Sequence, residues 1–244
     1  MVTFWNVINK VIREADIILE VLDARSIDKT RNVEIEDKVR DSGKTLIYVM
    51  NKCDLVDVDE VKERKKELKP SVFISAKDHL GTKMLREAIL KHADKKEIKV
   101  GVLGYPNTGK SSLINALKGR ASAKASAESG YTKGLQNVRI SKRILLLDTP
   151  GVIPYKEKDE IKHGSTGSVD YSQVKDPEEV VFSLFGEHPG IVDFYDVDGD
   201  DEEEMLENIA LKFRYLKKGG VADTKKAARM ILKDWQRGNI VLKE

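Results

Sequence analysis

One stretch of the sequence, residues 104–111, reads Gly-Tyr-Pro-Asn-Thr-Gly-Lys-Ser and fits the phosphate-loop pattern G-x-x-x-x-G-K-[ST]. Its glycines let the backbone curl so that successive N–H groups face phosphate oxygens, and its lysine neutralises the β and γ phosphates. An apolar run at 98–103 precedes the loop and a helical pattern at 112–117 follows it, as this motif requires. We therefore expect phosphate binding by Asn107, Thr108, Gly109, Lys110, Ser111 and Ser112, with Ser111 also a Mg²⁺ ligand.

Outward from this loop, short apolar runs rich in β-branched residues alternate with charged segments of helical pattern. This alternation predicts an α/β fold, in which helices cover both faces of a mostly parallel, six-stranded sheet. The expected strands are residues 17–22, 45–50, 71–74, 98–103, 138–140 and 144–147, and the expected helices 4–14, 59–69 and 82–93.

After Gly151 the character of the sequence changes. Residues 154–176 are polar, and helical patterns follow, with Pro177 suited to begin one helix and Thr224 to cap another. We predict a nucleotide-binding domain at 1–160, a mobile switch or linker at 161–176, and a small, basic, all-helical C-terminal domain at 177–244.

Two short motifs before the phosphate loop have the chemistry that recognises guanine. In Asn51-Lys52-Cys53-Asp54 the aspartate can accept both the N1–H and the exocyclic amine of guanine, a donor pair that adenine lacks, with the lysine along the base. Ser75-Ala76-Lys77 ends another strand and can supply a backbone N–H to the guanine O6. Either motif alone is also compatible with an ordinary strand-to-helix turn, but together with a phosphate loop they select guanine. The expected guanine-binding residues are Asn51, Lys52, Asp54, Ser75, Ala76 and Lys77.

A further motif, Asp148-Thr149-Pro150-Gly151, follows the last expected strand. An aspartate there can hold Mg²⁺ through water, and the glycine N–H can sense the γ-phosphate. Signalling GTPases place a glutamine next, which orients the attacking water, whereas this chain has Val152 and Ile153. Neither side chain can hydrogen-bond a water, so we expect slow hydrolysis.

The order of these motifs is unusual, because the guanine motifs precede the phosphate loop and the D-x-x-G motif. In this order the chain resembles the YlqF/YawG family of circularly permuted GTPases, over most of its length. Residues 20–25, Glu-Val-Leu-Asp-Ala-Arg, with Arg31 and Asn32, also look like the first strand of that family. The tail from Leu216 to Asp234 resembles its C-terminal helical domain.

The resemblance implies hydrolysis of GTP to GDP and phosphate, with Mg²⁺ as cofactor. Residues 129–132, Ser-Gly-Tyr-Thr, are similar to the family's switch segment, so Thr132 would be a second Mg²⁺ ligand. Asn107 matches an asparagine that helps hold K⁺ in related potassium-activated GTPases; the alternative is a side chain that only shapes the loop. Members of the family act on ribosomal subunits during assembly, which implies a ribosomal subunit and its rRNA as partners.

Composition limits the remaining possibilities. Lys and Arg number 43 against 41 Asp and Glu, so net charge alone does not indicate nucleic-acid binding. Residues 205–244, however, hold ten Lys or Arg and only four Asp or Glu, with interleaved aromatic residues, a pattern that fits an RNA-facing surface as well as a solvated one. Cys53 is the single cysteine, and no apolar run approaches the roughly 20 residues of a membrane span. We expect a cytoplasmic monomer with no intrachain disulfide and no membrane attachment.

In the permuted order, the segment after Gly151 is tied only to the C-terminal domain, so we expect the γ-phosphate to move that domain relative to the core. We interpret the chain as a GTP-binding protein with slow intrinsic hydrolysis, acting as a nucleotide-dependent switch in ribosomal subunit assembly. The alternative is a regulatory GTP-binding module that recruits a protein partner without needing hydrolysis. An ATPase or adenine-nucleotide kinase is opposed by Asp54.

Overall fold

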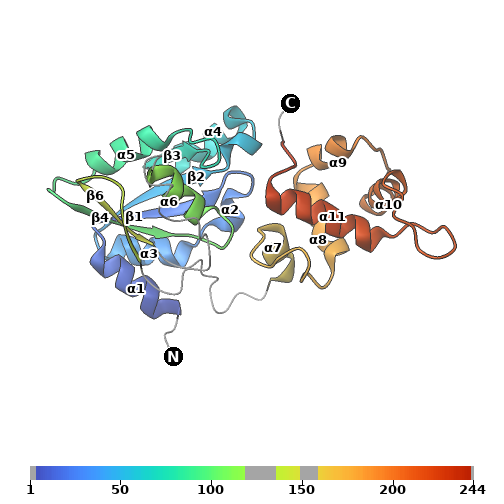
Figure 1. Ribbon diagram of the computed structural model, residues 1–244, viewed down its shortest axis with the longest axis horizontal. Coiled ribbons are helices and arrows are strands. Elements are labelled where there is room, and N and C mark those ends of the chain that lie inside the picture. The colour runs from blue at the N-terminus through green and yellow to red at the C-terminus, as the bar shows by residue number, and fades with distance from the viewer. Residues whose placement is uncertain (1–3, 119–135, 149–158, 243–244) are drawn as a thin grey trace. The chain divides into compact units, whose positions relative to one another are not determined.

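The computed structural model of the protein describes residues 4–118, 136–148 and 159–242. The chain forms two compact units, Met1–Glu157 and Lys158–Glu244, and each is described by itself (Figure 1). Within the described ranges, no helix is long and apolar enough to cross a lipid bilayer.

The first unit is built on a six-stranded sheet with the strand order β3-β2-β1-β4-β6-β5. Neighbouring strands are parallel except β5 and β6, which are antiparallel. The predicted α/β fold with a mostly parallel sheet is therefore confirmed. The strands are β1 (Ile17–Asp23), β2 (Thr45–Asn51), β3 (Ser71–Ile74), β4 (Ile98–Leu103), β5 (Gln136–Arg139) and β6 (Ile144–Asp148).

Helices cover both faces of this sheet (Figure 1). One face packs on α5 and α6 through a core that includes Leu19 and Val21 of β1, and the other packs on α1 and α3 through a core that includes Ile18. Because both faces are covered, all seven residues of β1 are buried and the strand reads as a nearly continuous apolar run. The helices described in this unit are α1 (Phe4–Glu14), α2 (Ile27–Thr30), α3 (Val33–Asp41), α4 (Val58–Glu67), α5 (Thr82–Lys91) and α6 (Lys110–Lys118), with a 3₁₀ turn, η1 (Cys53–Leu55).

Helix α3 was not among the predicted elements. Most of its residues are charged, and the apolar residues that it buries are only Ile35 and Val39, four positions apart. Its start is fixed by Asn32, whose side-chain oxygen accepts a hydrogen bond from the Ile35 N–H at 3.1 Å. A narrow apolar stripe and an asparagine cap are enough for a helix once the sheet buries that stripe.

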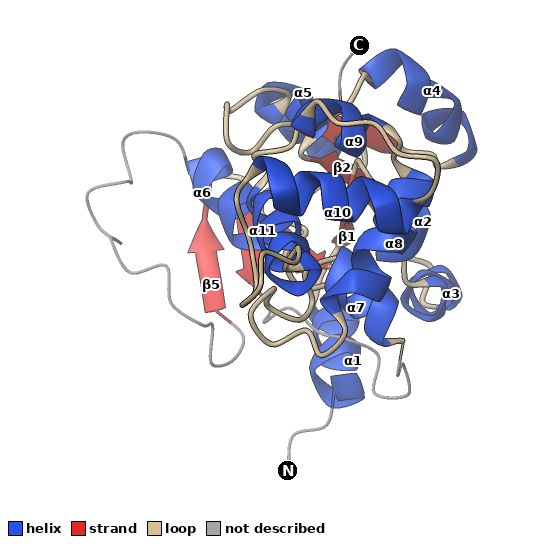
Figure 2. Ribbon diagram, turned by 90° about the vertical axis from the view of Figure 1, so that its right-hand side faces the viewer, coloured by secondary structure: helices blue, strands red, loops and turns tan. Residues whose placement is uncertain are grey.

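The second unit is a group of helices around the buried indole of Trp235. Helix α11 (Thr224–Arg237) carries this tryptophan and contacts α7, α8 and α10 (Figure 2). Helices were expected at the C-terminal end of the chain, and the structure has them there. The other helices of this unit are α7 (Glu160–Ser165), α8 (Pro177–Glu187), α9 (Gly190–Tyr195) and α10 (Glu202–Lys212).

Residues 161–176, for which the sequence predicts a mobile switch or linker, are partly helical. They contain most of α7 and belong to the second unit, where Trp235 Nε1 donates to the Ser165 carbonyl oxygen at 2.7 Å. A Cβ on Gly164 would lie only 2.9 Å from the Val180 side chain, so the helix backbone packs closely there. These contacts involve the backbone carbonyl of Ser165 and the absence of a Cβ on Gly164. A polar composition does not predict such contacts.

The N-cap of α11 also differs from the prediction. Asp223, not Thr224, caps the helix by accepting a hydrogen bond from the Lys226 N–H at 3.2 Å. The Thr224 hydroxyl donates instead to the Glu178 carboxylate at 2.6 Å. Both residue types can cap a helix, and the contact with α8 decides between them.

A cluster of ionisable groups lies between β1, β2 and α3. Glu20 of β1 is fully buried and accepts a hydrogen bond from the Asn32 N–H at 2.8 Å. Glu36 of α3 pairs with Arg31 at 2.8 Å and accepts a hydrogen bond from the Tyr48 hydroxyl at 2.8 Å. Burial, together with the neighbouring Glu36 carboxyl, raises the pKa of Glu20 to about 8 from its ordinary value of 4.5. Glu20 is therefore protonated in the folded protein at neutral pH.

The substitution Glu20→Gln should remove part of the pH dependence of stability. Because Glu20 binds its proton more tightly in the folded state, its contribution to stability is complete below pH 4.5 and is lost as the pH rises through about 8. In the wild type we expect this group to lower the free energy of unfolding by on the order of 1 kcal/mol per pH unit across that window, and in Glu20→Gln it cannot. Urea unfolding, followed by Trp5 fluorescence in a Trp235→Phe background, measures this in the first unit.

The matched control is Glu97→Gln, which changes a surface carboxylate paired with Arg139 at 2.6 Å and should keep the wild-type pH dependence. If Glu20→Gln and the wild type lose stability in parallel between pH 5 and 8, the buried proton on Glu20 is contradicted.

Candidate nucleotide-binding site

The predicted site residues come from the carboxyl ends of neighbouring strands. β4 runs directly into the phosphate loop, and the β1–β2 register sets Asp23 opposite Asn51 at the ends of their strands. Parallel strands end at one edge of the sheet, and open α/β sheets bind their ligands at that edge. The topology therefore gathers motifs that lie far apart in the sequence.

Asn51 joins three of the predicted motifs. Its side-chain amide donates to the Thr108 carbonyl oxygen of the phosphate loop at 2.8 Å, and its side-chain oxygen accepts from the Ala76 N–H at 3.1 Å. Asn51 is only 2% exposed, so both hydrogen bonds are shielded from water. The phosphate loop and the turn after β3 are thus held to the end of β2 by one side chain.

The backbone of the phosphate loop has the conformation that its sequence allows. Gly104, Asn107 and Gly109 have positive φ angles of 145°, 58° and 91°, a region that favours glycine and tolerates asparagine. A Cβ on Gly109 would lie 2.2 Å from Asn51 Nδ2, so a larger residue cannot enter without displacing the bridging amide.

Lys110 is buried at the start of α6, and its Nζ donates to the carbonyl oxygens of Gly104 (2.9 Å) and Tyr105. The first N–H groups of a helix have no acceptor within it, and here they belong to the turn that holds Ser111 and Ser112. A buried cation beside a helix N-terminus suits a phosphate group.

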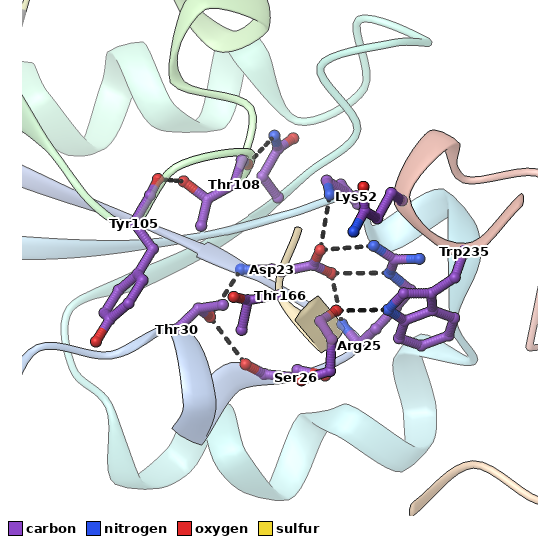
Figure 3. A network of polar contacts seen from close by, with 12 residues as sticks. Asp23, Arg25, Ser26, Thr30, Lys52, Tyr105, Thr108, Thr166 and Trp235 are labelled. Carbon is purple, nitrogen blue, oxygen red and sulfur yellow. Dashed lines mark hydrogen bonds and ion pairs between the residues drawn. The ribbon is translucent and has the colours of Figure 1, made fainter. Parts of the chain in front are cut away.

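The carboxylate of Asp23 lies between two cations at the end of β1 (Figure 3). Its Oδ2 accepts from Lys52 Nζ at 2.7 Å and from Arg25 Nη2 at 2.8 Å, and its Oδ1 accepts from Arg25 Nε at 3.0 Å. Burial alone would raise the pKa of Asp23, but Arg25 and Lys52 hold this pKa well below its usual range. No role for Asp23 was predicted from the sequence, although an aspartate that ends an apolar strand is a signal that could have indicated one.

The other guanine-motif residues lie in two turns beside this group. Lys52 has a left-handed backbone (φ 63°) and leads into η1, which carries the partly exposed Asp54. Ser75 is buried, and its hydroxyl donates to the Asp78 carboxylate at 3.0 Å and accepts from the Asp78 N–H at 3.1 Å. The same turn exposes Lys77. Asp54 and Lys77 therefore remain accessible from outside the core.

The structure describes only some of the residues that are predicted to contact the γ-phosphate or its Mg²⁺. Asp148 ends β6 and lies opposite Val102 of β4, two residues before the phosphate loop begins, so its backbone is at the same edge of the sheet. Thr132, Gly151 and Val152 lie outside the described residues, as does the side chain of Asp148.

The fold and the site define a P-loop GTPase domain in circular permutation, with the guanine motifs after β2 and β3 and the phosphate loop after β4. A family model described as "50S ribosome-binding GTPase" matches residues 99–209. The chain is similar in structure to GDP-bound "TM YlqF", with a TM-score of 0.71 and 26% identity over 96% of each chain. It is also similar to GNP-bound YlqF from T. maritima, with a TM-score of 0.68, 26% identity, and coverage of 96% of this chain and 93% of that one.

Two curated relatives match nearly the whole chain. The "Uncharacterized GTP-binding protein MJ1464" of Methanocaldococcus jannaschii is 43% identical over 96% of this chain and 65% of its own length. "Nucleolar GTP-binding protein 2" of Saccharomyces cerevisiae is 36% identical over 97% of this chain and 52% of its own length. The chain thus spans less than two thirds of the length of these relatives. The chain has the fold of a circularly permuted, YlqF-like GTPase domain.

The substitution Gly109→Ala should disable the site. The new Cβ would clash with Asn51 Nδ2, so the bridging hydrogen bond to Thr108 breaks and a buried amide is left without its acceptor. We expect the affinity for GDP to fall on the order of 100-fold, since an unpaired buried polar group costs about 1–3 kcal/mol before the loop itself is distorted. Titration with fluorescent GDP measures the effect.

Gly43→Ala is the matched control for backbone strain. Gly43 also has a positive φ (65°), but nothing lies within 4 Å of the position that an alanine Cβ would take, so only the local strain of about 1–2 kcal/mol is added. This variant should lose stability and keep its GDP affinity. Equal GDP affinity in Gly109→Ala and the wild type would contradict the bridging role of Asn51.

Proposed function

We propose that the chain binds GTP and GDP, hydrolyses GTP slowly, and acts as a nucleotide-dependent switch in the assembly of a ribosomal subunit. The observation that carries the proposal is the Asn51 bridge, which fixes a guanine-recognising motif to a phosphate loop. The names of the matched family and of the yeast relative, which mention the 50S ribosome and the nucleolus, support the ribosomal setting. We place this activity in the cytoplasm, as a monomer without membrane attachment.

In this proposal the phosphates are bound by the N–H groups of residues 107–112 and by Lys110, and the base is recognised by the Asp54 carboxylate, with Lys52 along its plane. Mg²⁺ would be held by the hydroxyls of Ser111 and Thr132, and by Asp148 through water. Hydroxyl and carboxylate oxygens are the ligands that Mg²⁺ prefers, and the β4–β6 register, which brings Asp148 to the strand before the loop, supports this set. The bound ion supplies positive charge against the phosphates.

Slow hydrolysis is proposed because Val152 stands where a water-orienting glutamine is found in signalling GTPases. A monovalent cation beside the phosphates would offset part of the developing negative charge, and we propose Asn107 as a ligand of K⁺. The left-handed backbone of Asn107 (φ 58°) equally suits a residue that only shapes the loop, so the two roles need separate tests.

The substitution Asn107→Gly separates these roles. Glycine accepts the same backbone angle but has no side-chain oxygen, so the loop is preserved while the proposed K⁺ ligand is removed. We expect wild-type turnover to be at least several-fold faster in KCl than in NaCl of equal concentration, and Asn107→Gly to turn over equally slowly in both. Phosphate release under saturating GTP measures the difference. A wild type indifferent to the cation, or a glycine variant that keeps K⁺ stimulation, would remove Asn107 as a ligand.

The rRNA partner is supported by a surface on the second unit. Residues 213–222 connect α10 to α11, are mostly exposed, and contain a bridge between Leu216 and Ala222. It presents Lys217 and Lys218 together with Phe213, which is 42% exposed and whose ring stacks on that of Tyr215 with the ring centroids 6.2 Å apart. Basic side chains beside an accessible aromatic face suit phosphates and unpaired RNA bases.

Co-sedimentation with purified ribosomal subunits tests this partner. The double substitution Lys217→Glu and Lys218→Glu should weaken binding to one subunit at least tenfold, because two phosphate contacts become repulsive, and should flatten its dependence on salt. Lys62→Glu with Lys66→Glu, on exposed positions of α4, is the matched control and should bind as the wild type does. Binding that ignores both salt and the Lys217 pair would contradict the RNA surface.

The alternative, a GTP-binding module that recruits a protein partner without hydrolysis, predicts a different outcome with ribosomes. A ribosomal subunit should accelerate turnover by the wild type if hydrolysis belongs to the cycle, and Lys110→Ala should abolish that acceleration. Binding to a subunit with turnover unchanged would favour the alternative.

A further inference from the structure

Asp23, Arg25 and Lys52 form a group of ion pairs at the end of β1, and this group holds the Lys52 side chain in place. Lys52 belongs to the motif after β2, and its Nζ lies 2.7 Å from Asp23 Oδ2, across to the neighbouring strand (Figure 3). The Asp23 side chain is only 5% exposed, and that of Lys52 is 19% exposed. This pair is therefore shielded from water and screened little by salt, unlike an ion pair on the surface.

The rest of the group holds Asp23 in place. Arg25 binds both oxygens of the carboxylate, through Nε at 3.0 Å and Nη2 at 2.8 Å, and its own backbone N–H donates to Oδ1 at 3.1 Å. The backbone N–H of Asp23 donates to the Thr30 hydroxyl at 3.1 Å. The carboxylate is fixed from several sides, so it can in turn fix a flexible partner.

Lys52 is a residue that needs such fixing. Its backbone has a left-handed φ of 63°, which is strained for a residue that bears a side chain and is typical of functional positions. A free lysine side chain has many rotamers, and this conformational entropy is lost when the side chain is ordered. The ion pair with Asp23 removes that freedom in the protein itself, before any ligand arrives.

We propose that Asp23 is a positioning residue for guanine-nucleotide binding: it holds the Lys52 side chain extended, so that its stem is already ordered when the base packs along it. The proposal rests on the function proposed above, in which Lys52 lies along the guanine. Pre-ordering a ligand-contacting side chain raises affinity by lowering the entropy lost on binding. Asp23 itself need not touch the nucleotide.

The test compares the affinity for fluorescent GDP in four forms of the full chain: wild type, Asp23→Asn, Lys52→Met, and the double variant. We expect Asp23→Asn to weaken GDP binding roughly tenfold, the equivalent of about 1.4 kcal/mol. In the Lys52→Met background the same substitution should change the affinity less than twofold, because the side chain that Asp23 orders is gone. A purely structural role would lower affinity equally in both backgrounds, which overturns the proposal.

Steady-state hydrolysis supplies a second measurement. Asp23→Asn should raise KM for GTP by a factor similar to the loss of GDP affinity, with kcat within about twofold of the wild type, because the base is remote from the reacting phosphate. A fall in kcat with unchanged KM would contradict a role in nucleotide positioning.

Two further variants keep the test decisive. Asp16→Asn is the matched control, because Asp16 precedes the same strand and pairs with Lys95 at 2.6 Å at its other end; its GDP affinity should be that of the wild type. If Asp23→Asn does not fold, Asp23→Glu keeps the charge while moving the carboxylate, and a wild-type GDP affinity in this variant counts against the proposal. If the wild type binds no guanine nucleotide, the proposed function is overturned as well. If the wild type binds GDP, but with the same affinity as Asp23→Asn, only the positioning role is overturned.

Discussion

The side-chain amide of Asn51 is the constraint on which the geometry of the site depends. A buried amide destabilises the folded state unless both its N–H group and its oxygen form hydrogen bonds. In Asn51 each of these partners comes from a different loop. If either loop moved, a polar atom would be left unsatisfied in the interior. The phosphate loop and the turn after β3 therefore keep a fixed distance from each other, with β2 as their common support. The close approach of Gly109 to the same amide follows from this arrangement.

The sheet could be predicted from the sequence because burial on both faces turns each parallel strand into an apolar run, as in β1. A helix beginning near Thr224 was predicted and α11 is found there, since its apolar positions recur at helical spacing. Helix α3 was missed because so few of its residues are apolar. That residues 161–176 belong to the second unit was not predicted, because their anchors include a backbone carbonyl, which no side-chain pattern displays.

Motif spacing likewise identified the candidate site residues but not the contacts among them. Asn51 and Thr108 are 57 positions apart, and only the strand order brings them together. The ion-pair partners of Asp23 could not be predicted either. Lys52 follows a different strand, and Arg25 turns its side chain back to the residue two positions before it. β1 thus buries two acids in different states: Glu20, beside another carboxyl, keeps its proton, while Asp23, between two cations, has lost it.

The strand order has a consequence for how the chain is made. Synthesis proceeds from the N-terminus, so β1, β2 and β3 emerge before β4, which begins only at residue 98. Until β4 arrives, one side of β1 has no hydrogen-bonding neighbour, although this strand ends up in the middle of the sheet. A nearly apolar strand with an open edge is a template for pairing with other chains. The nascent protein therefore passes through a stage that is prone to aggregation and suited to chaperone binding, and the arrival of β4, with the phosphate loop directly behind it, ends that stage.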